Sequence, residues 1–449
     1  MLKPPQPKGL PLLGHLPQIA KERHQFLPRL GHTYGDICRF RLGTREVYLV
    51  NHPDWIQQVI GGNKWVRTPV TRKMMASFLG QGVFSLEGPP HLQQRRLMQP
   101  AFHRERLIQY TEIMTAQTHR YLSTWQDGET RDIDRDMMRL TLEIVSQCLF
   151  GASTSAEAAE IGEAFAQVQR AVDREYRLYA LLPQWMPVIR FGAAKRAVEF
   201  TQRVTHRIVE ARRKAGKDHG DLLSMLISAK DEDGSALTDE QITAEVLSLI
   251  FAGHETTANT LAWTLYLLSE NPEALAKLTA ESDAVFGGRL PAYADLANLP
   301  YNDWVLKESL RLYPSAWYAE RTPLEDTSLG DYPIKAGTPV VFSTWVTHRD
   351  PRFFDQPTQF IPERFAPENA HKIHRYAYLP FGAGAHQCIG NVFATLESRL
   401  IIGLITSRFT LKTSPDHVPV PHAVVTMGIE NGLPMCVTAR HTKPGTILH

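Results

Sequence analysis

A single long helical pattern is the feature that most constrains how this chain can fold. Thr238 and Gln241 have the spacing of a helix capping box. The apolar residues then keep a helical spacing to about Ser269, where Asn271 and Pro272 end the pattern. About 30 residues with a rise of 1.5 Å each predict a helix about 45 Å long. Such a helix crosses a whole domain, so the other elements must pack around it.

The long pattern also carries polar side chains, namely Glu245, His254, Glu255 and Asn259. Such groups are costly inside a bilayer, so this helix is not a transmembrane span. The N-terminal segment, residues 1–12, is rich in proline and has no long apolar run. We therefore expect no signal peptide or membrane anchor, and a cytoplasmic protein.

Three stretches have the pattern of β-strands. Residues 36–50 surround a turn at Gly43, which predicts a hairpin. Residues 339–342 are a short apolar run, and residues 424–437 predict a second hairpin with its turn at Asn431-Gly432. The rest of the pattern is mostly helical, and no linker or repeat divides it. We expect one domain over residues 1–449, of the α+β class and predominantly helical.

Composition narrows the class of protein only modestly. The chain has 449 residues with 43% hydrophobic and 21% charged residues, as in ordinary soluble proteins. Its net charge of +2 gives no argument for binding nucleic acid or a membrane surface. The four cysteines, Cys38, Cys148, Cys388 and Cys436, form no CxxC pair, which disfavours a structural zinc site and fits a reducing compartment.

One of these cysteines, Cys388, lies in a glycine-rich loop, residues 381–390, just before another helical pattern. Glycines allow the backbone to bend tightly and to pass close to a flat, bulky group. At a helix N-terminus, backbone N–H groups and the helix dipole stabilise a thiolate. A thiolate held there is a candidate axial ligand for haem iron. The alternative is an inert buried cysteine.

The loop resembles the haem-binding signature of the cytochrome P450 family. Its fixed positions correspond here to Phe381, Gly384, His386, Cys388 and Gly390. The resemblance implies haem b as cofactor and Cys388 as the ligand of its iron. With the motifs below it covers residues 4 to about 437 and is nearest to soluble bacterial members related to fatty-acid hydroxylases.

A second motif lies in the middle of the long helix, at Ala252-Gly253-His254-Glu255-Thr256-Thr257. Glycine and threonine are poor helix formers, and Gly253 removes a side chain that would fill space beside the helix. The segment resembles the oxygen-activation motif of the same family. The resemblance implies that the Thr256 hydroxyl supports oxygen activation and that Glu255 links it to a proton supply. A polar patch on an exposed helix is the alternative.

Other positions match the family's structural and cofactor-binding residues. Glu308, Arg311 and Arg364 correspond to an ion-pair set, which we assign to structure; a surface ion pair is the alternative. The resemblance implies haem contacts for the following residues, with solvated surface charges as the alternative for the basic ones: His91, Arg95, Arg321, His386, Phe381, Gly382 and Gly253.

A hydrophobic substrate needs a mostly apolar pocket. The candidates are Phe84, Phe78, Leu79, Ala252, Ala316, Trp317, Met427 and Ile429. By resemblance, the segment 77–84 is a loop over the distal haem face, with Phe84 above the iron. Plain core packing is the alternative for each residue. Arg45 and Tyr48 could bind a fatty-acid carboxylate, although exposed strand positions explain them equally well.

The resemblance implies an oxidoreductase: a monooxygenase that uses O2 to hydroxylate a hydrophobic small molecule such as a fatty acid, terpenoid or steroid. No flavin or iron–sulfur domain follows, so we expect a separate ferredoxin or flavodoxin with its reductase. Candidates for docking it are Arg96, Arg104, Arg106 and Lys372. The alternatives are a peroxygenase or haem-thiolate isomerase, and a non-catalytic haem sensor or electron carrier.

Overall fold

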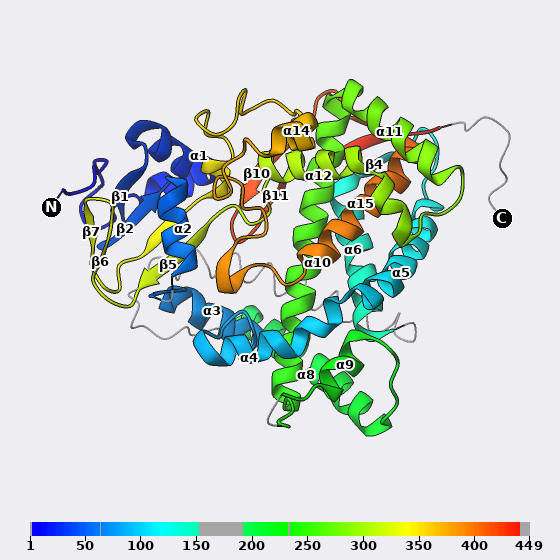
Figure 1. Cartoon of the computed structure of the whole chain (residues 1–449), viewed down its shortest axis with the longest axis horizontal. Coiled ribbons are helices and arrows are strands. Elements are labelled where there is room, and N and C mark those ends of the chain that lie inside the picture. The colour runs from blue at the N-terminus through cyan, green and yellow to red at the C-terminus, as the bar shows by residue number, and fades with distance from the viewer. Residues whose placement is uncertain (1, 63, 152–191, 232–233, 441–449) are drawn as a thin grey trace.

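The computed structural model describes residues 2–62, 64–151, 192–231 and 234–440. Helices dominate this part of the chain, and small sheets gather mainly at the N-terminal end of the molecule (Figure 1). The helical region contains α4 (Gly88–Met98), α5 (Arg104–Leu122), α6 (Ile133–Phe150), α8 (Gly192–Ala215), α9 (Leu222–Ser228), α10 (Asp239–Glu270), α11 (Pro272–Phe286), α12 (Pro300–Leu312) and α15 (Asn391–Arg408). The predicted fold class is confirmed.

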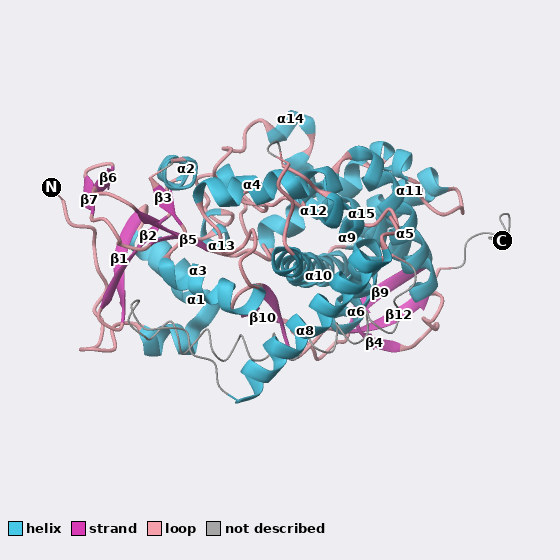
Figure 2. Cartoon of the chain, turned by 90° about the horizontal axis from the view of Figure 1, so that it is seen from below, coloured by secondary structure: helices cyan, strands magenta, loops and turns pink. Residues whose placement is uncertain are grey.

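Helix α10 is the predicted long helix and runs through the helical region. Thr238 is its N-cap: the Thr238 hydroxyl accepts from the Gln241 N–H at 3.2 Å, and the Gln241 side chain accepts from the Thr238 N–H at 2.9 Å. The helix packs against α6, α8, α12 and α15, which surround it when it is viewed nearly end-on (Figure 2). Val246 in its N-terminal half and Trp263 in its C-terminal half are both fully buried, so α10 is the axis of the core.

The largest sheet is five-stranded, in the order β1-β2-β8-β5-β3. Its strands are β1 (Ile37–Leu42), β2 (Arg45–Val50), β8 (Val340–Phe342), β5 (Ala319–Pro323) and β3 (Trp65–Val66). The predicted hairpin at residues 36–50 is confirmed, with Leu42 opposite Arg45 across Gly43. The other α-helices of the described ranges are α1 (Leu16–Tyr34), α2 (Pro53–Gly61), α3 (Pro69–Leu79), α13 (Thr344–Thr347) and α14 (Pro367–Ala370). A small sheet pairs β6 (Thr327–Leu329) with β7 (Tyr332–Ile334).

The predicted hairpin at residues 424–437 is wrong. The turn does form, since Asn431 and Gly432 both have positive φ, of 70° and 75°. The strands beside it separate: β11 (Met427–Glu430) pairs with β10 (Val420–Ala423), whereas β12 (Pro434–Ala439) lies between β4 (Thr130–Asp132) and β9 (Phe409–Thr413). The Leu433 N–H donates to the Asp132 carboxylate at 2.9 Å, so the turn is anchored on β4 and β12 is held away from β11.

No helix in the described ranges is long and apolar enough to cross a membrane.

Candidate functional site

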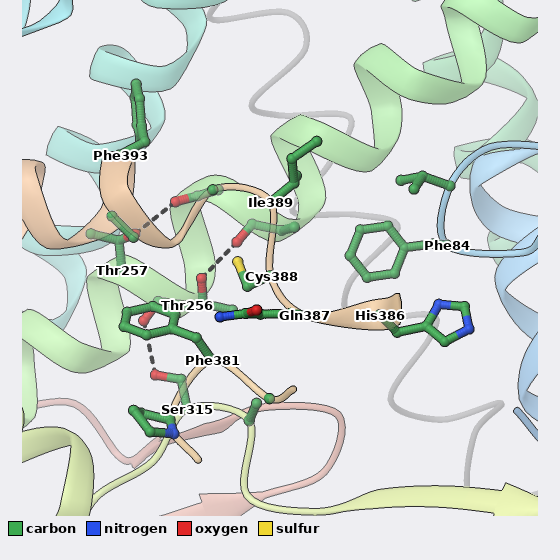
Figure 3. Close-up of a pocket in the computed structure, with 18 of the residues that line it drawn as sticks. Phe84, Thr256, Thr257, Ser315, Phe381, His386, Gln387, Cys388, Ile389 and Phe393 are labelled. Carbon is green, nitrogen blue, oxygen red and sulfur yellow. Dashed lines mark hydrogen bonds between the residues drawn. The ribbon is translucent and has the colours of Figure 1, made fainter. Parts of the chain in front are cut away.

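A cavity of about 430 Å³ lies between α10 and the loop 381–390. Its lining comes from segments far apart in the sequence, including α4, α6, β5 and α15. Figure 3 shows the sulfur of Cys388 in the same space as Thr256, with Phe84 on another wall. The fold therefore brings residues of the two main sequence motifs to one cavity.

The cysteine loop is held in shape by its glycines and by backbone hydrogen bonds. Gly382 and Gly384 have φ values of +65° and +71°, which favour glycine. A Cβ on Gly384 would lie 2.6 Å from the Ile60 carbonyl oxygen of α2, so no larger residue fits there. The Cys388 N–H donates to the Phe381 carbonyl at 2.9 Å. These contacts fix the sulfur at the start of α15.

The electrostatics of Cys388 are those of a thiol that needs a positive partner to ionise. The sulfur is accessible from the cavity yet surrounded by protein. Burial raises the pKa of the Cys388 thiol, although the Gly390 backbone N–H and the charge of Arg95 oppose this. Binding to a metal cation deprotonates such a thiol. The site therefore fits a group that brings a metal ion to the sulfur.

Five basic side chains line the cavity: Arg67, His91, Arg95, Arg321 and His386. The described lining contains no acidic residue. The nearby Glu87 carboxylate accepts from the His386 imidazole at 2.8 Å and balances only part of this positive charge. Such an excess of donors fits a planar, largely apolar group with carboxylates at its edge, as haem has. Sequence reasoning had identified four of the five residues.

Arg67 is the residue that sequence reasoning missed. It follows β3, which pairs with β5 so that Val66 lies opposite Thr322, and this register brings Arg67 near Arg321. Burial and the charge of Arg321 lower the pKa of Arg67 to about 10. Its guanidinium donates to the carbonyls of Val83, at 3.3 Å, and Phe84. No sequence motif marks this position.

His91 and His386 lie side by side, with ring centroids 4.2 Å apart. Burial lowers the pKa of His91 to about 4, and it lowers the pKa of His386 despite the opposing contact with Glu87. Both imidazoles are therefore neutral near pH 7. The Nδ1 atom of His386 is buried and has no hydrogen-bond partner among the described residues, so it is available to a ligand.

On α10 the motif residues divide between two cavities. Thr256 lines the main cavity and its hydroxyl donates to the Ala252 carbonyl at 2.6 Å. Glu255 instead borders a second, polar cavity, where it accepts a hydrogen bond from the Thr426 hydroxyl. Gly253 lines the main cavity, but a Cβ there would lie 3.1 Å from Val145 of α6. The glycine therefore also permits close packing of α10 on α6.

The predicted ion-pair set is formed and buried. The Arg311 guanidinium donates two hydrogen bonds to Glu308, of 2.7 and 2.8 Å, and Arg364 donates a third at 3.2 Å. Arg311 and Glu308 are fully buried. Arg311 also bonds three backbone carbonyls, those of His348, Pro357 and Gln359. The set joins α12 to the segment before the cysteine loop and does not line the cavity, which fits a structural role.

Only some of the substrate-pocket candidates line the cavity. Phe84, Ala252 and Ala316 line the cavity, together with Leu249 and Tyr318, which sequence reasoning did not select. Five candidates are not among the lining residues and pack in the core: Phe78, Leu79, Trp317, Met427 and Ile429. The first two are also the last residues of helix α3, so the expected loop begins only at Gly80.

Of four further candidates, two lie away from the cavity and two have partners within the protein. Tyr48 is 9% exposed and packs inside the five-stranded sheet, and neither Tyr48 nor Arg45 lines the cavity. Arg96 lies 3.6 Å from Asp231, and Arg106 donates to the Gly220 carbonyl at 2.7 Å. These two basic residues therefore have internal partners as well as exposed surface.

A thiol that faces a helix across a cavity with a cationic edge fits a cofactor site of the haem-thiolate class. The sequence model for "Cytochrome P450" matches residues 4–430. A cyclooctatin synthase of Streptomyces melanosporofaciens is 37% identical over 91% of this chain and 90% of its own length. A cyclooctat-9-en-7-ol 5-monooxygenase from the same organism is 35% identical over 91% and 89%. The structure titled "Crystal structure of cytochrome P450DA heme domain" matches with a TM-score of 0.90 and 26% identity, covering 98% of each chain.

The chain belongs to the cytochrome P450 family. It is accordingly an oxidoreductase with a haem-iron cofactor, a monooxygenase of hydrophobic molecules that uses O2 and a redox partner.

Proposed function

We propose that residues 1–449 form a single domain that binds haem b in the main cavity, where the Cys388 thiolate would hold its iron. The observation that carries this proposal is that Cys388 and Thr256 of α10 line the same cavity. Arg67, Arg95, Arg321 and the two histidines would hold the propionates at the cationic edge. Phe381 and Gly382 would lie against the haem face on the thiolate side, and Gly253 on the α10 side.

The bound haem supplies the iron chemistry that places one atom of O2 in a C–H bond and releases the other as water. The residues of the chain hold the reactants and deliver protons. Thr256, whose hydroxyl lies on the cavity wall, would present a hydrogen bond to the oxygen side of the haem. Glu255, the adjacent residue, would pass protons to it from the polar cavity on its other side. The apolar wall would exclude bulk water.

The proposed substrate is a cyclic terpenoid hydrocarbon or alcohol. The wall around Phe84, Leu249, Ala252 and Ala316 is almost entirely apolar, which suits a compact hydrocarbon skeleton. The monooxygenase relative is named for cyclooctat-9-en-7-ol. A fatty acid is less well supported, because neither Arg45 nor Tyr48 lines the cavity to receive a carboxylate.

The proposed electron donor is a separate ferredoxin or flavodoxin with its reductase. Arg96, Arg104, Arg106 and Lys372 remain docking candidates. The test is to change each to alanine and to measure the rate of haem reduction by the donor. Slower reduction with unchanged substrate binding is expected, and unchanged rates would remove the residues from the interface. The cytoplasmic location stays a prediction.

The test of the cofactor assignment is the absorption spectrum of the reduced protein with carbon monoxide. We expect the long-wavelength Soret band that indicates thiolate ligation. Cys388→Ser should lose that band, whereas Cys436→Ser, at a distant strand position, should keep it. Protein that contains no haem when haem is abundant would refute the assignment.

The substrate and the source of oxygen need separate measurements. Binding of cyclic terpenoids and of fatty acids is compared through the change in haem absorption when a ligand displaces water. Turnover with a reductant and O2 is compared with turnover with peroxide, which distinguishes a monooxygenase from a peroxygenase. Efficient turnover with peroxide alone would favour the peroxygenase.

A further inference from the structure

A second cavity, of about 100 Å³, lies on the Glu255 side of α10. Its polar lining consists of Asp134, Glu255, Asn259, His422 and Thr426, and these residues define the polar chamber. They come from the start of α6, from α10 and from the β10–β11 ribbon. Chain segments that are distant in sequence therefore gather several polar side chains next to the acid of the α10 motif.

The polar chamber contains hydrogen-bonding atoms that no described residue satisfies. Asn259 is 1% exposed, and its Oδ1 atom is buried without a partner, although its amide N–H donates to Thr426 at 3.2 Å. The Oδ1 atom of Asp134 is also buried without a partner. Buried polar groups are nearly always hydrogen-bonded, and a polar cavity of this size has room for several water molecules. The unsatisfied atoms therefore point to bound water.

The backbone keeps the chamber open. Gly428 of β11 borders it, and a Cβ added there would lie 3.1 Å from the Oδ1 atom of Asn259. An alanine at this position would thus crowd the one amide oxygen that faces the chamber without a partner. Glycine at residue 428 preserves room for water beside it.

Asp134 is suited to exchange protons with that water. Burial raises the pKa of Asp134 to about 6, and the charge of Asp132 adds to this effect while that of Arg135 opposes it. The titratable groups that border the chamber from the other elements are Glu255 and His422. An acid with a pKa close to the working pH both accepts and releases protons readily.

We propose that the polar chamber is the water-filled proton entry of this enzyme, with Asp134 as the outer carrier that resupplies Glu255. This inference rests on the proposed role of Glu255 and Thr256. The overall reaction takes a C–H bond, O2, two electrons and two protons, and yields a C–OH bond and water. For each proton consumed, Asp134 releases one through chamber water to Glu255 and regains one from solvent, so that its own charge is restored.

The first test does not depend on turnover. A high-resolution crystal structure of the haem-loaded protein should show ordered water in contact with Asn259 Oδ1 and Asp134. Infrared spectroscopy of the resting protein should show a protonated carboxyl band that titrates near pH 6 and is lost in Asp134→Asn. A dry chamber, or a band unchanged in the variant, would overturn the proposal. Gly428→Ala should displace the water while retaining the carboxyl band.

The second test measures coupling, as product formed per reductant consumed, across the pH range 5–8. Asp134→Asn should lower coupling by about three- to tenfold and flatten its pH profile. This decrease is smaller than that expected for loss of a directly positioned acid, because water still reaches Glu255. Gly428→Ala should act in the same direction. The control is Glu143→Gln, which removes an acid from the outer face of the same helix and should leave coupling unchanged.

Glu255→Gln separates this inference from the function on which it rests. If Glu255→Gln uncouples the enzyme and Asp134→Asn does not, the entry route is wrong and the role of Glu255 stands. If neither variant changes coupling, both are wrong. Uncoupling by both, with ordered water in the chamber, is the result expected.

Discussion

Glu245, a fully buried carboxyl on α10, should make this protein less stable as the pH rises. Its Oε1 atom accepts the N–H of Val83 at 2.9 Å, and its Oε2 atom has no partner among the described residues. Burial, opposed only by that backbone hydrogen bond, raises the pKa of Glu245 from 4.5 to about 8. The native state thus retains a proton that the unfolded chain has lost over this range.

The sign and size of the effect follow from this shift. Stability is greatest below pH 4.5, falls as the pH rises and levels off above about pH 8. At 1.36 kcal/mol per pH unit, the loss between pH 5 and pH 8 is about 3 kcal/mol. Glu245→Gln keeps the acceptor for Val83 and removes the titration. It leaves an additional amide N–H unsatisfied, which costs about 1 kcal/mol. The variant should be slightly less stable at pH 5 and more stable at pH 8.

The assay is denaturant unfolding of the haem-loaded variant and the parent protein at pH 5 and pH 8. The difference in unfolding free energy between them should change by about 3 kcal/mol in favour of the variant. Glu245→Leu, which removes the acceptor as well, should cost about 1–3 kcal/mol relative to Glu245→Gln at both pH values. The exposed Glu430→Gln is the control. A difference that stays constant between the two pH values would refute the assigned protonation state.

Three further changes test the site. Thr256→Ala should leave O2 consumption largely intact and lower the product formed per O2 by about tenfold or more, because it removes the hydroxyl on the side of the cavity where O2 would bind. Full coupling in this variant would contradict the proposed role of Thr256. Arg311→Met should lower the unfolding free energy by about 3–5 kcal/mol, since it leaves the buried Glu308 carboxylate with only Arg364 and the Ile361 N–H as partners. A loss below about 1 kcal/mol in denaturant unfolding would show that the set is dispensable. Arg67→Met should increase the rate of haem release by about tenfold, measured by transfer to an excess haem acceptor. Arg45→Met, at a residue that does not line the cavity, should not change this rate. Equal rates for the two variants would exclude a propionate contact of Arg67.

The sequence predicted best the positions of residues that belong to local motifs. The capping box at Thr238 located α10, and the spacing around Cys388 located the loop that faces it. Both signals are local, because a capped helix and a glycine turn depend on the residues beside them. The ion-pair set around Glu308 was also found, although only a family pattern linked Arg364 to it.

The failures concern contacts that depend on which strands pair. The turn at Asn431-Gly432 was correct as a turn, but its local conformation carries no information on the anchor supplied by Asp132. Arg67 was missed because only the pairing of β3 with β5 brings it to Arg321. Apolar positions such as Trp317 and Met427 were misassigned to the pocket, since the same residue types line a cavity and fill a core.

Arg67 has a consequence for how cofactor and substrate depend on each other. The Arg67 guanidinium donates hydrogen bonds to the carbonyls of Val83 and Phe84, and it also lines the cavity where the haem would lie. A haem carboxylate that orders Arg67 would then also order the backbone that carries Phe84, a wall of the substrate pocket. Haem binding and substrate binding would be thermodynamically linked, so a substrate that stabilises Phe84 should raise the equilibrium affinity for haem by the same factor by which haem raises the affinity for that substrate.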